Sequence, residues 1–199
     1  ICAQPGDCIW DDYNGDGVIT YAEGATCDRH EIGNPNPDVM LGINLGLAYK
    51  GFDFAVNGAG AFGQQIMRSY RSFGDAPYQN YDTTVLNRWH GEGTSNDQPR
   101  LSNSGTGQNN TIWVSNRYME DADYFKIKTV TLGYDFKNLW KSCPLQQLRL
   151  YVQAQNLITF TGYTGLDPEV GNSGGGTGWA SGVDLGLYPT SRTYLVGEI

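Results

Sequence analysis

Residues 39–61 alternate large apolar side chains with small or polar ones along two arms. A period of two is typical of β-strands, and the apolar positions change from odd to even beyond Lys50-Gly51. A two-residue turn at Lys50-Gly51 requires this change, because it pairs Tyr49 with Phe52, and directly paired residues point to the same face. The stretch therefore predicts one β-hairpin whose apolar face comprises Val39, Leu41, Ile43, Leu45, Leu47, Tyr49, Phe52, Phe54 and Val56.

The length of the two arms and their second face indicate a membrane barrel. About ten alternating residues suffice to cross a bilayer as a tilted strand, and this exceeds the usual length of a globular strand. Glycine and asparagine make a poor sandwich core but suit a water-filled lumen. We assign to that second face Gly42, Asn44, Gly46, Asn57, Gly58 and Gly60. The alternative is a soluble β-sandwich hairpin with a glycine-rich exposed face.

The composition favours strands and loops. Glycine accounts for 27 of 199 residues, and charged residues make up only 17%. The formal net charge of -8, without a basic stripe, excludes a nucleic-acid partner. No run of about 18 apolar residues predicts a transmembrane helix, and barrel strands never form such runs.

Further strands are predicted at 124–136, 148–158 and 191–199, while 62–123 holds no sustained strand. A slip in the alternation near Lys128-Thr129 indicates a bulge or the point where a strand leaves the membrane. The connections alternate tight, long, short and long. Outer-membrane barrels place short turns in the periplasm and long loops outside. We therefore expect residues 1–38 and both long connections to be extracellular, and 39–199 to hold barrel strands and their loops.

Five strands cannot close a barrel, which needs about eight. The predicted fold is therefore all-β, with antiparallel strands that form the C-terminal part of a large transmembrane β-barrel. The end, Gly197-Glu198-Ile199, lacks an aromatic closing residue, so we expect a chain that is incompletely sequenced, cleaved or truncated.

Residues 12–23 match the twelve-residue calcium loop position by position. Gly17 stands at the sharp bend, but Pro5 and Gly6 cannot belong to an incoming helix, which excludes an EF-hand regulator. We predict a structural Ca²⁺ ion; the alternative is an acidic turn that holds no metal tightly. The predicted ligands are Asp12, Asn14, Asp16, the carbonyl of Val18, Thr20 and Glu23.

No catalytic constellation is visible. The four cysteines, at 2, 8, 27 and 143, fit no zinc signature, and Cys8 and Cys27 leave open a disulfide across the acidic loop. His30 is the only other histidine, and no nucleophile is arranged near either one, so His90 is interpreted as a loop residue. The chain is therefore predicted not to be an enzyme.

Eight motifs follow one another along nearly the whole chain: GDCIWDDYNGDGVI (6–19), IGNPNPD (32–38), YKGFD (49–53), RW (88–89), TLGY (131–134), AQNL (154–157), DPE (167–169) and YPTSRTY (188–194). In this order they resemble the late region of SusC/RagA-type TonB-dependent transporters. The resemblance implies an outer-membrane barrel of about 22 strands. It also implies a plug domain, a SusD-like surface lipoprotein partner, contact with TonB through a missing N-terminal part, and import of oligosaccharides or peptides. The competing hypothesis is a soluble, calcium-stabilised carbohydrate-binding β-module. Neither the substrate nor the oligomeric state follows from the sequence.

Overall fold

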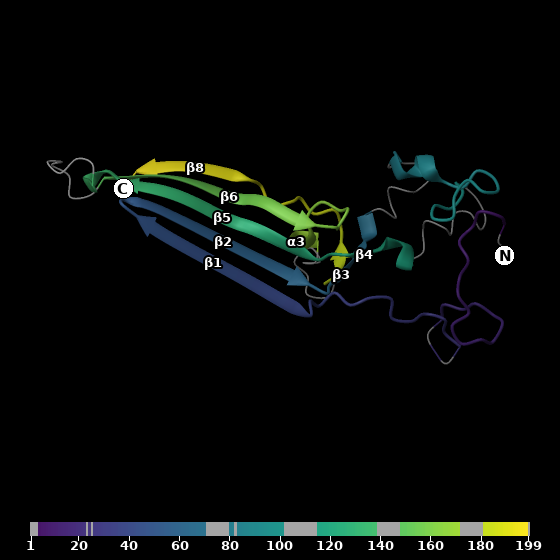
Figure 1. The fold of residues 1–199 in the computed structure, drawn as a ribbon. Coiled ribbons are helices and arrows are strands. Elements are labelled where there is room, and N and C mark those ends of the chain that lie inside the picture. Colours follow the sequence, from purple (N-terminus) through teal and green to yellow (C-terminus); the bar gives the residue numbers. More distant parts are fainter. Residues whose placement is uncertain are drawn as a thin grey trace. The chain divides into compact units, whose positions relative to one another are not determined.

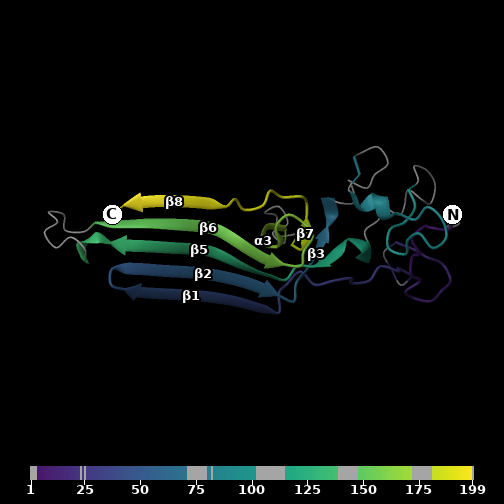
Figure 2. The ribbon, with the colours of Figure 1, turned by 45° about the horizontal axis from the view of Figure 1, so that its top comes forward.

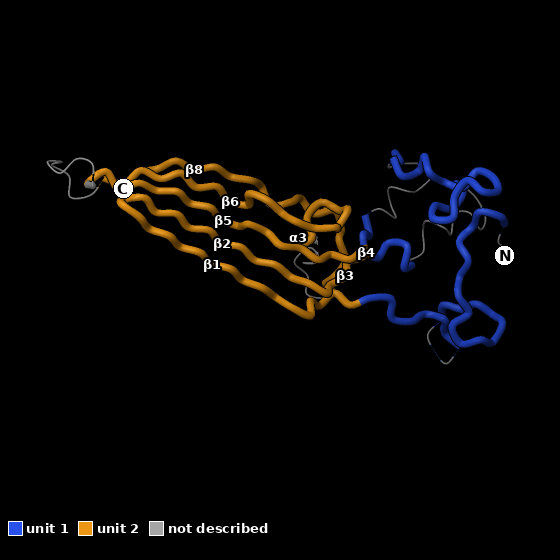
Figure 3. The backbone as a smooth tube through the Cα atoms, viewed as in Figure 1, with its two compact units in different colours: residues 1–33, 68–119 blue, residues 34–67, 120–199 orange. Residues whose placement is uncertain are grey.

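A computed structural model of the chain describes residues 4–22, 24, 26–70, 80–81, 83–101, 115–138, 148–171 and 181–198. The chain divides into two compact units, residues 1–33 with 68–119 and residues 34–67 with 120–199 (Figure 3). These units do not test the predicted boundary between an extracellular segment, residues 1–38, and the barrel strands and loops, residues 39–199. That boundary stays a prediction.

The second unit is built on a five-stranded antiparallel sheet in the order β1-β2-β5-β6-β8 (Figures 1 and 2). The predicted all-β antiparallel fold is confirmed, and helical structure among the described residues is limited to short pieces. The five strands are β1 (Val39–Tyr49), β2 (Phe52–Phe62), β5 (Tyr124–Asp135), β6 (Arg149–Thr161) and β8 (Thr193–Glu198). The short helices are η1 (Thr83–Asn87), η2 (Asn116–Tyr118), η3 (Phe136–Asn138) and α3 (Pro168–Gly171).

The predicted hairpin is confirmed down to its turn. Tyr49 pairs with Phe52, and the pairing runs without a break to Val39 opposite Phe62. Lys50 and Gly51 adopt φ angles of 49° and 90°. Two central residues with positive φ make the type I′ turn, whose twist matches that of paired strands.

One face of this sheet is apolar across all five strands. The pairing aligns Leu47, Phe54, Leu132, Val152 and Val196 in a single row. Their side chains are not covered: Leu132 and Val152 are each 52% exposed and Val196 is 80% exposed. This face is therefore not the core of a two-layer sandwich within the described residues.

The register corrects the assignment of two glycines. Gly58 pairs with Ile43 and Gly60 with Leu41, so both lie on the apolar face and not on the polar one. A β-carbon on Gly58 would lie 2.7 Å from the ring of Phe125, and one on Gly60 would lie 3.0 Å from it. The two glycines therefore leave room for an aromatic ring that lies flat against β2.

The opposite face is polar and mostly uncharged. Asn44 pairs with Asn57, as expected, and the same row continues through Thr129, Gln155 and Thr193. Amide and hydroxyl side chains thus line one transverse row on all five strands.

The predicted irregularity near Lys128 is a β-bulge. Between its pairs with Asn57 and Gly58, β5 carries one extra residue, Lys128. Opposite it, β6 carries two residues, Asn156 and Leu157, and Asn156 adopts a positive φ of 51°. Bulges bend a strand and re-aim its side chains.

Both long connections leave the sheet at one end, where a second, small sheet forms in the order β4-β3-β7. Its strands are β3 (Gln65–Arg68), β4 (Met119–Asp121) and β7 (Val183–Asp184). Ile66, Ala122 and Tyr163 form a buried cluster there. The sequence did not predict these strands, because two to four residues are too few to show an alternation.

Within the described residues, no helix is both long enough and apolar enough to cross a membrane.

Candidate functional site

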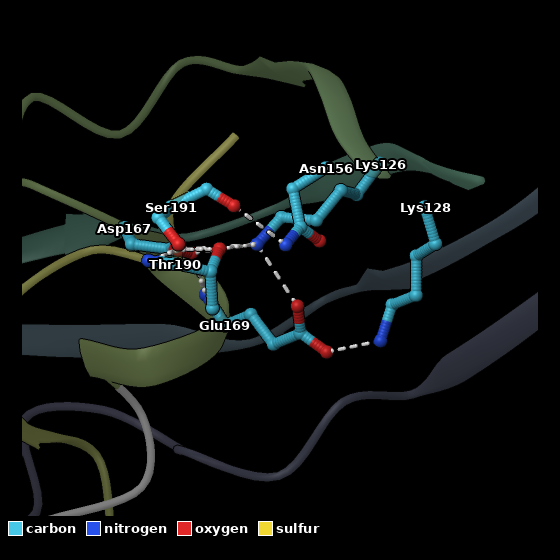
Figure 4. A network of polar contacts seen from close by, with 7 residues as sticks. All are labelled: Lys126, Lys128, Asn156, Asp167, Glu169, Thr190 and Ser191. Carbon is cyan, nitrogen blue, oxygen red and sulfur yellow. Dashed lines mark hydrogen bonds and ion pairs between the residues drawn. The ribbon is translucent and has the colours of Figure 1, made fainter. Parts of the chain in front are cut away.

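A buried ammonium group lies at the centre of the most extensive polar cluster of the second unit (Figure 4). Lys126 of β5 is only 1% exposed. Its Nζ donates to both carboxylate oxygens of Asp167 (3.1 and 3.0 Å), to Oε2 of Glu169 (2.9 Å) and to Oγ1 of Thr190 (3.1 Å). A buried charge is tolerated only when it is paired and hydrogen-bonded, and Lys126 is both.

Asp167 joins the two ends of the last long connection. Its Oδ1 accepts from the backbone N–H of Glu169 (3.1 Å), and its Oδ2 accepts from the backbone N–H and hydroxyl of Thr190 (3.1 and 2.8 Å). Burial acts to raise the pKa of Asp167, but the hydrogen bonds from Thr190 and Lys126 outweigh it and hold the pKa below its ordinary value. Asp167 is therefore ionised at neutral pH.

Glu169 bridges two lysines. Its Oε2 accepts from Lys126 and its Oε1 from Lys128, whose side chain is 41% exposed. Burial acts to raise the pKa of Glu169, but the hydrogen bonds from Lys128 and Lys126 lower it overall. Every carboxylate oxygen of Asp167 and Glu169 thus accepts at least one hydrogen bond.

The bulge in β6 contributes a second contact beside the cluster. The side-chain amide of Asn156 donates to the backbone carbonyl of Ser191, at 3.0 Å (Figure 4). Asparagine is one of the few residues other than glycine that tolerate a left-handed backbone. The contact is made just before β8 begins at Thr193.

Three motifs that are distant in the sequence meet here: AQNL (154–157), DPE (167–169) and YPTSRTY (188–194). Sequence reasoning did not find their common partner, Lys126. The signal was present, because a lysine stands between two large apolar residues, Phe125 and Ile127, within a predicted strand. The hydrogen bonds of the cluster hold together the beginning and the end of the connection between β6 and β8.

The predicted calcium loop lies in the first unit, and the chain curls around Asp12. Oδ1 of Asp12 accepts from the backbone N–H of Gly15 (2.8 Å) and of Asp16 (3.2 Å), and Oδ2 accepts from Gly17 (2.7 Å). Gly17 adopts a φ of 82°, which fits the sharp bend expected there. Asn14 Oδ1 accepts from the backbone N–H of Asp16, and Asp16 Oδ1 from that of Val18. The bend thus brings together Asp12, Asn14 and Asp16.

The remaining predicted ligands are less well placed. The hydroxyl of Thr20 donates to the carbonyl of Thr26, and Glu23 lies outside the described residues. Among the described residues, no three His, Cys, Asp or Glu side chains are grouped to hold a metal ion; Asn14 is of another type, and Glu23 is not among them. Sequence reasoning also missed buried Asp28, which accepts from the backbone N–H of Thr20 (2.6 Å) and of Asn14 (3.4 Å).

Cys8 and Cys27 are not bonded to each other, so the disulfide that their spacing left open does not form in this structure. Burial raises the pKa of the Cys8 thiol, against the opposing influence of Arg117. The exposed His90 hydrogen-bonds within its own loop, to the carbonyl of Arg88 and the hydroxyl of Thr94. His90 is thus a loop residue whose hydrogen bonds stay within the loop, as the sequence predicted.

A sheet of long antiparallel strands, polar on one face and apolar but uncovered on the other, is typical of the class of transmembrane β-barrel walls. No protein-family model matches the chain. TonB-dependent receptor P3 of Formosa agariphila is 31% identical over 199 residues, which cover 98% of this chain and 19% of that protein. TonB-dependent receptor SusC of Bacteroides thetaiotaomicron is 29% identical over 198 residues, covering 98% of this chain and 17% of that protein.

Solved structures agree with these relatives. The RagAB peptide transporter matches with a TM-score of 0.66 and 26% identity over 82% of this chain and 17% of its own. The RagAB peptide importer in its open-open state matches with a TM-score of 0.66 and 25% identity over 92% of this chain and 19% of its own. The resemblance to SusC/RagA-type TonB-dependent receptors is thus confirmed over nearly the whole chain, which spans about a fifth of the length of the relatives it matches. The predictions of a receptor and not an enzyme are confirmed, and the soluble module is not favoured.

Proposed function

We propose that the full-length protein is an outer-membrane transporter that imports oligosaccharides or peptides with energy delivered through TonB. In this proposal the five-stranded sheet is part of the barrel wall. The observation that carries it is the apolar face that continues, uncovered, across β1, β2, β5, β6 and β8 opposite a polar face.

The dimensions support a lipid contact for this face. A strand of 11 residues such as β1 is roughly 36 Å long at about 3.3 Å per residue. Tilted by about 40°, it spans roughly 28 Å, close to the apolar band of about 25 Å on outer-membrane barrels. The exposed leucines and valines would then face hydrocarbon instead of water.

The lengths of the connections support an orientation with the tight turn in the periplasm, because outer-membrane barrels carry short turns there and long loops outside. The turn end carries aromatic side chains on the apolar face, and the rings of Phe52 and Tyr134 lie 4.4 Å apart between centroids. Tyr49 lies beside them in the pairing, and aromatic residues are typical of both interfaces of such barrels. The long connections, the small sheet and residues 1–38 would then be extracellular.

The substrate class rests on the relatives and on the polar face. Among the solved structures, RagAB is a peptide transporter, and SusC is a TonB-dependent receptor. The uncharged row of Asn44, Asn57, Thr129, Gln155 and Thr193 suits hydroxyl groups of sugars and amides of peptides equally well. The partners of the full-length protein would be a SusD-like surface lipoprotein and, through a part outside this chain, TonB.

Fractionation of the full-length protein tests the membrane assignment. We expect it to remain with the outer membrane, to require detergent for extraction and to migrate differently on a gel before and after boiling. A folded protein that is soluble without detergent would contradict the proposal. Uptake of labelled oligosaccharides and peptides, compared in cells with and without TonB, then separates the two substrate classes. Co-purification with a tagged receptor tests for the lipoprotein.

We also propose that residues 12–23 hold a structural Ca²⁺ ion. Asp12, Asn14 and Asp16 would supply side-chain oxygens, Val18 its carbonyl, Thr20 a hydroxyl or a bridging water and Glu23 a carboxylate. The support from the fold is the bend at Gly17 and the hydrogen bonds that orient the carboxylate of Asp12. Without flanking helices the ion would have nothing to open, so its role would be to order an extracellular loop.

A further inference from the structure

The pairing between β6 and β8 is short, and its register is weakly specified by side-chain pattern. Only six pairs join the two strands, from Leu150 opposite Glu198 to Gln155 opposite Thr193. A slip by one residue would turn every side chain to the wrong face, but a slip by two preserves the faces. The alternation of Tyr194, Leu195 and Val196 therefore cannot exclude a two-residue slip.

Polar contacts just before β8 distinguish these registers. Thr190 donates its hydroxyl and its backbone N–H to Asp167, and its hydroxyl oxygen lies 3.1 Å from Nζ of Lys126. One residue later, the carbonyl of Ser191 accepts from Asn156 of β6. These contacts come two and three residues before the first pair, at Thr193.

We propose that Lys126 and Asn156 form a register lock for the β-strand β8. Lys126 fixes the position of Thr190 through Asp167, and Asn156 fixes Ser191 directly. Since Lys126 belongs to β5 and Asn156 to β6, the lock fixes the start of β8 relative to the two strands that precede it in the sheet.

The distances show why a slipped strand would lose the lock. A two-residue slip moves the chain by roughly 6.6–6.8 Å along the strand axis. A hydrogen bond tolerates only a few tenths of an ångström, so neither Thr190 nor Ser191 would reach its partner. Lys126 and Asp167, 1% and 6% exposed, would then keep fewer of the hydrogen bonds that their burial requires.

Lys128 provides a matched control within the same cluster. Within the described residues it pairs with Glu169 and not with Asp167 or Thr190, and its side chain is 41% exposed against 1% for Lys126. Lys128→Met removes one positive charge from the cluster, as Lys126→Met does, but it leaves the hydrogen bonds of Thr190 and Ser191 in place.

Disulfide trapping in the full-length receptor tests the lock, in a background whose native cysteines are replaced by serine. Gln153→Cys with Leu195→Cys reports the observed register, because the two residues are directly paired. Gln153→Cys with Thr193→Cys, and Gln155→Cys with Leu195→Cys, report slips by two residues in either direction. In the observed register these two pairs are diagonal, at about 7–8 Å, which is too far for a disulfide.

We expect Lys126→Met to lower the ratio of in-register to slipped product by about tenfold or more, as the loss of buried hydrogen bonds implies. Asn156→Gly should lower it by less, and Lys128→Met should leave it unchanged. Glycine keeps the positive φ of position 156, so Asn156→Gly decides the outcome should Lys126→Met fail to fold. An unchanged ratio in Asn156→Gly and in any folded Lys126→Met overturns the lock. An equal fall in Lys128→Met also overturns it, because the effect would then follow charge alone.

Discussion

The guanidinium of Arg149 lies directly above Gly133, where any other residue would carry its side chain. A β-carbon on Gly133 would lie 2.6 Å from Nη2 and 2.8 Å from Nε of Arg149. From this place Arg149 makes two hydrogen bonds to the carboxylate of Asp53, at 2.9 and 2.6 Å. Arg149 belongs to β6, Gly133 to β5 and Asp53 to β2, so the ion pair crosses an intervening strand over its glycine.

This relationship predicts that Gly133→Ala destabilises the receptor. The added methyl group displaces the flexible ends of Arg149 and Asp53, so the expected loss is that of a partly exposed ion pair, about 1 kcal/mol at most. The temperature at which the receptor loses its heat-modifiable form in detergent should fall accordingly. Gly46→Ala is the matched control, because Gly46 lies on the same polar face and a β-carbon there meets nothing within 4 Å. Equal effects of the two substitutions would mean that Arg149 does not depend on the glycine.

A second prediction concerns the two faces of the hairpin. Ile43→Arg should destabilise the barrel by about 2–4 kcal/mol if residue 43 lies near the membrane midplane. Asn44→Arg, one residue away on the polar face, should be nearly neutral. Ile43 shares its face with Leu41, Leu45, Phe54 and Val56 in the observed register, and Asn44 shares its own with Asn57. Refolding equilibria in lipid vesicles measure both effects, and similar losses at 43 and 44 would contradict the assigned faces.

The hairpin could be predicted from the sequence because its information is local. The parity change around Lys50-Gly51 and the turn chemistry lie within a few residues of one another, and both point to one register. Gly58 and Gly60 were placed on the wrong face because a glycine has no side chain to report its direction. The even parity of Phe52, Phe54 and Val56, continued to positions 58 and 60, already indicates the apolar face, and the unbroken pairing with Ile43 and Leu41 shows it.

The Lys126 cluster could not be predicted in the same way. Lys126 precedes Asp167 by 41 residues and Thr190 by 64, and nothing local indicates that these groups meet. The motifs DPE and YPTSRTY contain the acidic and hydroxyl partners, but the sequence assigned these residues no role and did not single out the lysine. The short strands β3, β4 and β7 were missed because tertiary hydrogen bonds, such as that from the N–H of Met67 to Gly182, define them.

A third prediction is the pH dependence of the cluster. The pKa values of Asp167 and Glu169 lie below their ordinary values of 3.8 and 4.5. A carboxylate with a lowered pKa contributes stability that is fully present above its ordinary pKa and is lost as the pH falls through the lowered value. We therefore expect the contribution of the cluster to be constant from pH 7 to about pH 5, to decline as the pH falls below the ordinary pKa values, and to be lost once the pH passes the lowered values.

The temperature of heat modification, measured in detergent from pH 7 to pH 3, checks this sign. Asp167→Asn should lower that temperature at pH 7 and should reduce its further fall below about pH 4, because one of the titrating groups is gone. Glu92→Gln, which removes an exposed carboxylate in the first unit, should leave the fall in place. A destabilisation by Asp167→Asn that grew as the pH fell would contradict the assigned direction of the pKa shift.

The last prediction is calcium binding by residues 12–23 of the full-length receptor. Asp16→Asn should weaken it by about tenfold or more, because three ligand positions share the charge that holds the ion. Asparagine still has a side-chain oxygen to accept the hydrogen bond from the N–H of Val18, so the substitution removes charge and spares the turn. Asp11→Asn, next to the first ligand position, should have little effect. Bound calcium, counted by elemental analysis after equilibration near 10⁻⁴–10⁻³ M, separates the two variants.

An experimental density map at millimolar calcium should show about six or seven oxygens at 2.3–2.6 Å around one ion. An ordered loop with only water at its centre would show that the acidic turn holds its shape without metal.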